Sequence, residues 1–178
     1  MKKEENFLES FKQALISTIK SISQKKDCEI KFGTPDKVEN NNINLPEVKK
    51  VDNLEDITSV RAIADSEALR LKYSNKEIFD LHRPEGEIAE KLYKIAEKIR
   101  YEKIGSDEFK GIKKNISIAF NARKKTNYLD NSDKNKKEIL IEEKFDLYLR
   151  SFFFKVEKNK RIDLSLKKVK KEWDKSFK

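Results

Sequence analysis

The residue types that could do chemistry are concentrated between Arg61 and Asn115. This stretch contains the one His of the sequence, His82, together with three of the four glycines and one of the three prolines. Arg61 and Asp65 are four residues apart, so on a helix their side chains lie close enough to form an ion pair. A single His does not make a catalytic or metal site, and we favour a structural or interface role for His82.

Motifs for nucleotide binding, zinc binding and thiol chemistry are missing from the sequence. A phosphate-binding loop needs closely spaced glycines before Lys and Ser or Thr, but Gly105 and Gly111 are separated by five residues and Ile follows the second. Structural zinc requires about four Cys or His ligands, whereas the chain has one of each. Cys28 lies between Asp27 and Glu29, whose charges disfavour a thiolate. We therefore expect no catalytic, cofactor-binding or metal-ligating residue in this chain.

Hydrophobic periodicity predicts a mainly α-helical protein. Apolar residues recur at helical spacing in Phe7 to Ile22, Leu54 to Leu71, Ile88 to Ile99, Phe109 to Phe120 and Ile162 to Trp173. We expect Asn6 to cap the first of these helices and Pro84 to occupy the first turn of the third. Gly105 is placed to end the third helix in a left-handed conformation. A short helical turn through Ile78 and Phe79 precedes His82.

One short β element is also predicted. Residues 28–32 alternate between apolar and polar side chains, which is typical of a strand. No good partner strand is evident, because 48–51 fits poorly and the Asn- and Pro-containing stretch 33–53 favours a loop. Residues 138–154 are apolar nearly all round, which indicates a helix that is central to the core or covered by a partner. We favour the core, and a polar break over 127–135 precedes this helix.

Charge and composition limit the class of protein. The chain of 178 residues has a formal net charge of +9, and 41% of its residues are charged. From Lys155 to Lys178 there are ten Lys or Arg and four Asp or Glu. A nucleic-acid-binding protein using this tail and Trp173 is the alternative function. We consider nucleic acid unlikely as a partner, because Lys, Asn and Ile are enriched throughout the chain. The single Cys and the lack of an apolar run of about 20 residues lead us to expect a cytoplasmic protein without membrane contact.

The stretch around Arg61 resembles a known family. The run Arg61-x-x-Ala64-Asp65-Ser66-x-Ala68-Leu69-Arg70-Leu71 is similar to a signature of the cobaltochelatase CobT subunit family. The similarity continues in order at His82, Pro84-Glu85-Gly86, Glu97 to Gly105, Gly111 and Asn115. Upstream it includes Phe11-Lys12-Gln13-Ala14-Leu15, Phe32-Gly33 and Leu45-Pro46. The sequence departs from the family at Ala62, where Gly is usual, and in its tail.

This resemblance covers only the N-terminal part of the family. The family's C-terminal von Willebrand A-type domain holds a hard cation through Asp-x-Ser-x-Ser. Here Asp130, Asp163 and Asp174 are each followed by Lys where the second Ser should stand. We therefore expect a single domain over 1–178. In it, 1–53 form a helix, a short strand and a loop, 54–126 form the signature helices, and 136–178 form an apolar helix and a basic C-terminal helix.

The resemblance also implies a function. In the aerobic cobaltochelatase, an AAA+ ATPase subunit supplies the driving force and a large subunit binds the corrin, so the complex requires ATP, magnesium and cobalt. A CobT-type subunit couples the two, and the reaction inserts cobalt into hydrogenobyrinic acid a,c-diamide. We expect this chain to be a non-catalytic coupling module, with association into a homo-oligomer left open, or an adaptor of another AAA+ ATPase complex. The residues expected to have interface or framework roles are Arg61, Asp65, Arg70, His82, Arg100 and Glu102.

Overall fold

The structure is a computed structural model that describes residues 2–33, 42–48, 54–129, 140–154, 166–167, 169–171 and 173–175. The elements within these ranges are α1 (Lys2–Ser23), β1 (Glu29–Phe32), β2 (Asn42–Leu45), α2 (Leu54–Tyr73), α3 (Lys76–Leu81), α4 (Glu87–Glu108), α5 (Lys110–Leu129) and α6 (Ile141–Phe153). The predicted mainly α-helical class is confirmed.

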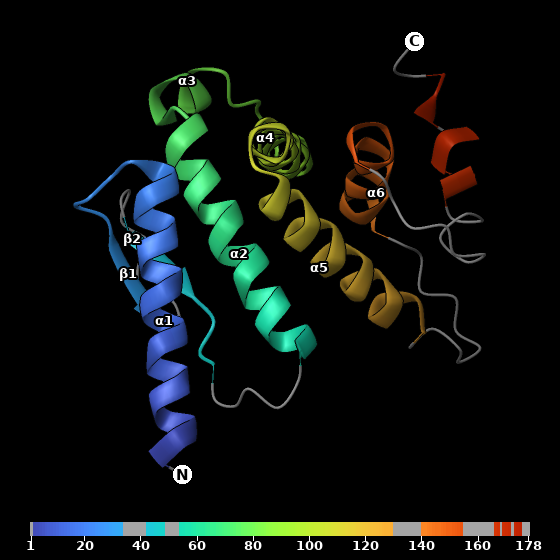
Figure 1. The fold of residues 1–178 in the computed structure, drawn as a ribbon. Helices are drawn as coiled ribbons and strands as arrows, with labels where there is room; N and C mark the ends of the chain where they lie inside the picture. The colour runs from blue at the N-terminus through green and yellow to red at the C-terminus, as the bar shows by residue number, and fades with distance from the viewer. Residues whose placement is uncertain are drawn as a thin grey trace.

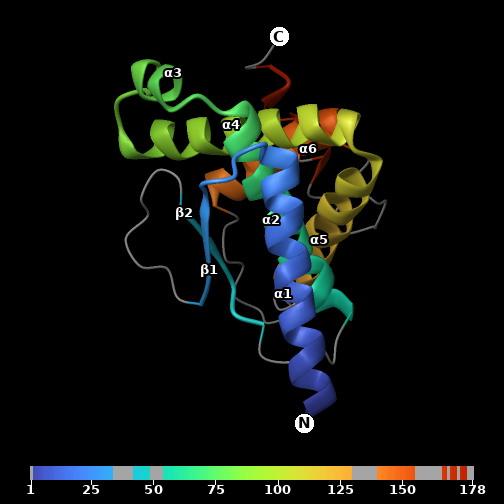
Figure 2. The same cartoon turned by 60° about the vertical axis from the view of Figure 1, so that its left-hand side comes forward.

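Helix α2 is the central element of the fold. It packs against α1 and β2 on one side and against α4 and α5 on the other, and Figure 1 shows it between α1 and α5. Figure 2 shows α4 running crosswise to α2. Helix α6 packs against α4, on the side of the molecule away from α1 (Figure 1). Every helix and strand of the described residues therefore contacts α2 directly or contacts a neighbour of α2.

The core on the α1 side of α2 is apolar. Leu15 and Ile19 are completely buried one turn apart on α1. They pack with a stripe on α2 made of Val60, Ala64, Ala68 and Leu71. These four residues belong to the face that the sequence periodicity predicted for the second helix, and their burial confirms it. The small Ala side chains fill little space, so α1 can lie close along α2.

The predicted strand at 28–32 is present, but the loop predicted over 33–53 is wrong for part of its length. Residues 42–45 form β2, which pairs parallel with β1. Ile43 and Leu45 are buried, whereas Asn42 and Asn44 are half-buried, so the stretch alternates with the period of a strand. The Asn residues conceal this alternation, because Asn is typical of turns. Of the partner strand considered at 48–51, only residue 48 is described, and it lies outside both strands.

Two predicted helix starts are wrong. Helix α1 begins at Lys2, and Asn6 lies inside it, with its carbonyl accepting a hydrogen bond from Ser10 Oγ at 2.8 Å. Pro84 lies before α4, whose N-cap is Gly86 with a φ of 97°. A positive φ of this size is open to Gly but strained for other residues. The backbone turn at Gly86, rather than the fixed φ of Pro84, therefore sets where α4 begins.

The short helix before His82 is confirmed. Asn75 is the N-cap of α3, and its side-chain oxygen accepts hydrogen bonds from the N–H groups of Glu77 and Ile78 at 2.9 and 3.2 Å. This is the bonding expected of a capping Asn. His82 is the C-cap of the same helix. Asn75 thus starts α3, and α2 has already ended at Tyr73.

Gly105 does not end the third predicted helix. It lies inside α4, which continues to Glu108, and no left-handed conformation occurs there among the described residues. A Cβ on Gly105 would lie 2.1 Å from Leu69 Cδ2 and 2.6 Å from Leu69 Cδ1. The missing side chain therefore allows the fully buried Leu69 of α2 to pack against the backbone of α4.

Helix α6 is only partly a core helix. Phe145, Leu147 and Tyr148 are buried, whereas Phe152 and Phe153 are 57% and 47% exposed. The predicted core position therefore holds for one face. Helix α5 extends to Leu129, so the break predicted over 127–135 is wrong for 127–129, and 130–135 lie outside the described residues. Half of the predicted helix over 162–173 also lies outside them, whereas 166, 167, 169–171 and 173 have helical backbone.

Candidate functional site

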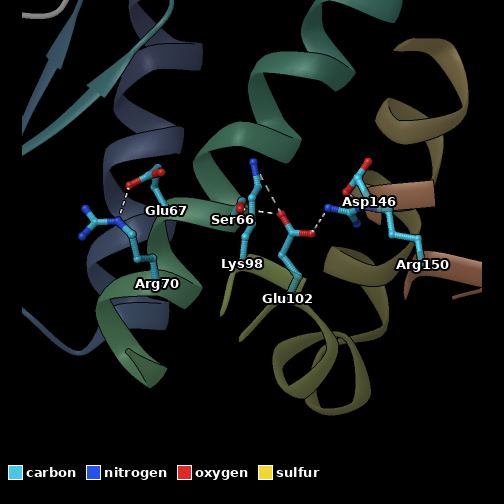
Figure 3. Close-up of polar contacts among 7 residues, drawn as sticks. All are labelled: Ser66, Glu67, Arg70, Lys98, Glu102, Asp146 and Arg150. Atoms are coloured by element: carbon cyan, nitrogen blue, oxygen red, sulfur yellow. Dashed lines mark hydrogen bonds and ion pairs between the residues drawn. The ribbon is translucent and has the colours of Figure 1, made fainter. Parts of the chain in front are cut away.

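A buried carboxylate, Glu102, joins three helices. Glu102 lies on α4 and is 3% exposed. Its Oε1 accepts a hydrogen bond of 2.6 Å from Ser66 Oγ of α2. Its Oε2 forms an ion pair of 2.7 Å with Nη2 of Arg150 on α6. Figure 3 shows both contacts converging on the Glu102 carboxylate. One side chain thus connects α2, α4 and α6.

Arg150 is buried to a similar extent and is surrounded by its partners. Besides Glu102, its Nε donates a hydrogen bond of 2.8 Å to Asp146 Oδ1. The guanidinium carbon lies 5.1 Å from the ring centre of Phe120 and 5.4 Å from that of Phe154, within the range of cation–π attraction. Burial lowers the pKa of Arg150, but the carboxylates of Glu102 and Asp146 outweigh it and the pKa stays above its ordinary value. Arg150 is therefore a permanent buried cation.

The Glu102–Arg150 pair lies in the wall of a cavity of about 370 Å³. The other residues that line it come from α2, α4 and α5, and they include Ala62, Ile63, Lys98, Ile116, Ala119 and Phe120. Lys98 is 46% exposed, and its Nζ lies 4.0 Å from Glu102 Oε1. At that distance Lys98 adds a favourable charge at the mouth of the cavity without a close hydrogen bond.

Asp65 forms a second buried link, on the side of α2 that faces α5. It is 1% exposed. Asn115 Nδ2 of α5 donates to Asp65 Oδ2 at 2.8 Å, and Arg61 Nε lies 3.4 Å from Oδ1. The predicted contact between Arg61 and Asp65 is confirmed. Burial raises the pKa of Asp65 above its ordinary value, although the bonds from Asn115 and Arg61 oppose the shift.

The side chains of the consecutive residues Asp65 and Ser66 point in different directions and bond to different helices. Successive side chains on a helix point about 100° apart, so Asp65 bonds to α5 while Ser66 bonds to α4. One turn later, Leu69 packs against Gly105. The motif residues of α2 thus fix the positions of the two helices that pack on this side of it.

The three other predicted site residues lie nearer the surface and apart from Glu102. Arg70 is half-buried, and its Nε contacts Glu67 Oε2 at 2.7 Å (Figure 3). Arg100 donates from Nη2 to the carbonyl of Tyr73 at 2.7 Å, which occupies one of the free carbonyls at the end of α2. His82 is exposed at the end of α3. The six residues therefore do not form one site.

The sequence reasoning missed Arg150 and Asp146. Within 145–154, Arg150 is the single cation and Asp146 the single carboxylate, and they are four residues apart. Charged residues are rarely buried unless they are paired. An acid and a base four residues apart in a helix that is otherwise apolar therefore indicate an ion pair that is buried with the helix. This spacing is the signal that could have identified Arg150.

The arrangement contains positive and negative charges that neutralise one another. Among the residues that the structure describes, no group of three or more His, Cys, Asp or Glu side chains is arranged to hold a metal ion. Within the same ranges, no helix is both long and apolar enough to cross a membrane. What the cluster does physically is to hold α2, α4, α5 and α6 in fixed relative positions.

Comparison with known proteins identifies the family. No solved structure matches this chain. The family model described as cobalamin biosynthesis protein CobT matches residues 5–156. This range includes Asp65, Ser66, Glu102 and Arg150, and it leaves out the end of the tail that the sequence motifs also failed to match. Because the match covers most of the sequence, this chain belongs to the CobT family of cobalamin biosynthesis proteins.

Proposed function

We propose that this chain is a non-catalytic subunit of an ATP-dependent cobaltochelatase, acting as an assembly and coupling module. The complex inserts cobalt, its substrate metal, into hydrogenobyrinic acid a,c-diamide. A AAA+ ATPase subunit binds ATP and magnesium, and a large subunit binds the corrin. The observation that carries the proposal is the match to the CobT family over residues 5–156.

The interior of the molecule supports a coupling role. Separating a buried ion pair leaves uncompensated charge in a medium of low polarity, which is costly. Because Glu102 bonds to both Ser66 and Arg150, α2, α4 and α6 resist sliding past one another. A displacement applied to one of these helices is therefore passed to the others. A module that transmits force between an ATPase and a second subunit needs such a rigid body.

The nucleic-acid alternative depends on an aromatic side chain that is used inside the molecule. A single-stranded nucleic acid would stack its bases on exposed rings. The ring centre of Trp173 instead lies 5.3 Å from that of Phe145 and 5.8 Å from that of Tyr148. These contacts dock Trp173 on α6, and they favour a structural role for it over base stacking.

The test is reconstitution with the cognate AAA+ ATPase. We expect the purified chain to co-elute with the ATPase and to change its rate of ATP hydrolysis, and the large subunit to join the assembly when the corrin is present. An ATPase that neither binds the chain nor responds to it, at concentrations where both are folded, would rule the proposal out.

A surface variant tests which framework residues also touch a partner. Arg70→Ala removes a half-buried guanidinium whose own contact is with Glu67 on the same helix. If Arg70 lies in an interface, the variant stays folded and loses the ATPase. If Arg70 only supports the packing of α2, folding and binding decline together. Lys113→Ala, which removes an exposed cation on α5, is the matched control and should retain both.

A further inference from the structure

A second cavity, of about 570 Å³, shares only Lys98 with the lining of the cavity beside Glu102. It is formed by the C-terminal part of α2, by α3, by α4 and by the turn that follows α1. Its lining residues are Lys25, Arg70, Leu71, Ser74, Lys76, Phe79, Asp80, Lys94, Glu97, Lys98 and Tyr101. Neither the family match nor the proposed function assigns it a role.

The lining of this cavity has an excess of positive charge. It includes five Lys or Arg side chains, against the two carboxylates of Asp80 and Glu97. Glu97 is already engaged, because Arg100 bonds to it at 2.6 Å and Ser74 Oγ donates to it. Burial raises the pKa of Glu97, but the bonds from Arg100 and Ser74 outweigh it and hold that pKa below its ordinary value. Glu97 therefore stays ionised in its pair with Arg100. The cations of the lining outnumber its carboxylates, and three of them also face carboxylates outside it, namely Glu67, Glu90 and Glu102.

Two of these cations, Lys94 and Arg70, are accessible to an incoming ligand. Lys94 is 58% exposed and its contact is a surface pair with Glu90, of the kind that contributes little and exchanges easily. Arg70 uses Nε for Glu67, and a guanidinium has four further N–H donors. Lys94 and Lys98 are one helical turn apart on α4, which separates them by about 6 Å along the axis.

The floor of the cavity is apolar and aromatic. Leu71 and Tyr101 are buried. Phe79 of α3 stacks on Tyr93 of α4, with ring centres 4.7 Å apart, and this contact fixes α3 over the cavity. A rigid aromatic wall beside several cations is suited to a ligand with an apolar group flanked by negative charges.

We propose that this cavity is a docking site for an acidic segment of a partner protein, with one aromatic or aliphatic side chain of the segment against Phe79 and Tyr101. The cations come from four separate parts of the chain, and two of them are spaced along α4. This distribution matches carboxylates placed along a peptide better than the single compact charge of a small anion. The docking site does not depend on which enzyme complex the chain serves.

The experiment measures binding of a short fluorescein-labelled peptide, made of Glu and Asp around one central Phe, by fluorescence polarisation. The control peptide has Gln and Asn in place of Glu and Asp. We expect the acidic peptide to bind and the neutral one not to. The Lys25→Glu/Lys94→Glu variant should weaken binding by at least about tenfold, since opposite charges at the rim become like charges.

Two further variants make the result specific. Lys113→Glu/Lys114→Glu changes the net charge by the same amount on the exposed face of α5 and should bind the peptide like the unaltered chain. Phe79→Ala should weaken binding at every salt concentration, because the lost contact is apolar. Circular dichroism establishes that each variant is folded.

Three outcomes would overturn the proposal. Equal weakening by the two double variants would show general attraction to a basic protein. Binding that is unchanged in the Lys25→Glu/Lys94→Glu variant would place the peptide elsewhere. Binding of ATP or of a short single-stranded DNA with the same dependence on Lys25 and Lys94, and no binding of the peptide, would make the cavity a site for a different ligand.

Discussion

The two sides of α2 are held in different ways. On the side of α1 and the sheet, the buried contacts are aliphatic, from Leu15 and Ile19 to Ala64 and Ala68. On the side of α4, α5 and α6, apolar packing is combined with the buried polar contacts of Asp65, Ser66, Glu102 and Arg150. The matched signature residue Asp65 belongs to the second side, whereas the matched residues Ala64, Ala68 and Leu71 belong to the first.

The two kinds of contact have different physical effects on how the helices are placed. Apolar contacts are not directional, so a face made of them tolerates small shifts and similar side chains. Buried hydrogen bonds and ion pairs are satisfied only at particular distances and angles. We infer that the α1 side supplies cohesion, whereas the α4, α5 and α6 side sets the geometry that a coupling module would need.

The largest expected effect comes from Glu102→Gln. The substitution keeps the size of the side chain and removes its charge, which leaves the buried Arg150 with Asp146 as its main partner. Removing one partner of a buried ion pair lowers the free energy of unfolding by about 3–5 kcal/mol. Because Arg150 keeps its contact with Asp146, we expect a loss near the lower end of this range. Urea denaturation of the two proteins measures the difference in free energy of unfolding.

The control for this prediction is a substitution of similar size on the apolar side. Leu15→Met should cost less than about 1.5 kcal/mol, as volume-conserving exchanges in cores usually do. Equal losses for Glu102→Gln and Leu15→Met would remove the distinction between the two sides of α2.

A double substitution tests whether the charge or the shape of the pair matters. Glu102→Met/Arg150→Met replaces both charges of this pair by apolar side chains. Asp146 then loses its contact with Arg150, but its side chain is 16% exposed and keeps access to water. Replacing a buried ion pair in this way is often neutral or stabilising, by about 1–4 kcal/mol. We expect the double variant to be more stable than Glu102→Gln alone. A double variant that is less stable than Glu102→Gln would show that the packing of the two side chains contributes more to stability than the pairing of their charges.

Gly105→Ala should have the next largest effect. The new Cβ would overlap Leu69 Cδ2 at 2.1 Å, and overpacking of this kind costs about 1–3 kcal/mol. Gly111→Ala is the control, because nothing lies within 4 Å of the position of its Cβ. That variant should gain about 0.5 kcal/mol from the higher helix propensity of Ala. Thermal unfolding that moves in the same direction for both variants would contradict close packing at Gly105.

The smallest expected effect is the pH dependence due to Asp65. Its pKa is raised above the ordinary value of 3.8, so between these two values the folded chain binds more protons than the unfolded chain. The stability contributed by this group is therefore lost as the pH rises through that window. Relative to the unaltered chain, Asp65→Asn should become more stable as the pH increases from 3.8 towards neutral. A stability difference that is constant over this range would exclude the raised pKa.

The sequence predicted the helical elements because their apolar residues recur with the period of a helix. It could place Val60, Ala64, Ala68 and Leu71 on one face of α2, and it could bring Arg61 to Asp65. It did not identify β2, because Asn42 and Asn44 favour a turn and conceal the alternation of Ile43 and Leu45, whose burial comes from distant contacts.

The remaining errors also concern contacts between distant parts of the chain. Gly105 has the composition and place of a helix terminator, but its role depends on Leu69 of another helix. The spacing of Asp146 and Arg150 is a local signal for a buried pair, but the contact of Arg150 with Glu102 depends on the packing of α6 on α4. Local patterns define elements, whereas the side chains that join elements are defined by partners far away in the sequence.

The order of Glu102 on α4 and Arg150 on α6 in the sequence has a consequence for synthesis on the ribosome. Glu102 emerges well before its guanidinium partner, and until α6 follows, its carboxylate can keep water at the Oε2 side. Docking of α6 then replaces that water with the guanidinium of Arg150, whose Nη2 lies 2.7 Å from Oε2. In a nascent chain stopped before Arg150, Glu102 would therefore stay hydrated, and the surface of α4 that packs against α6 would stay exposed.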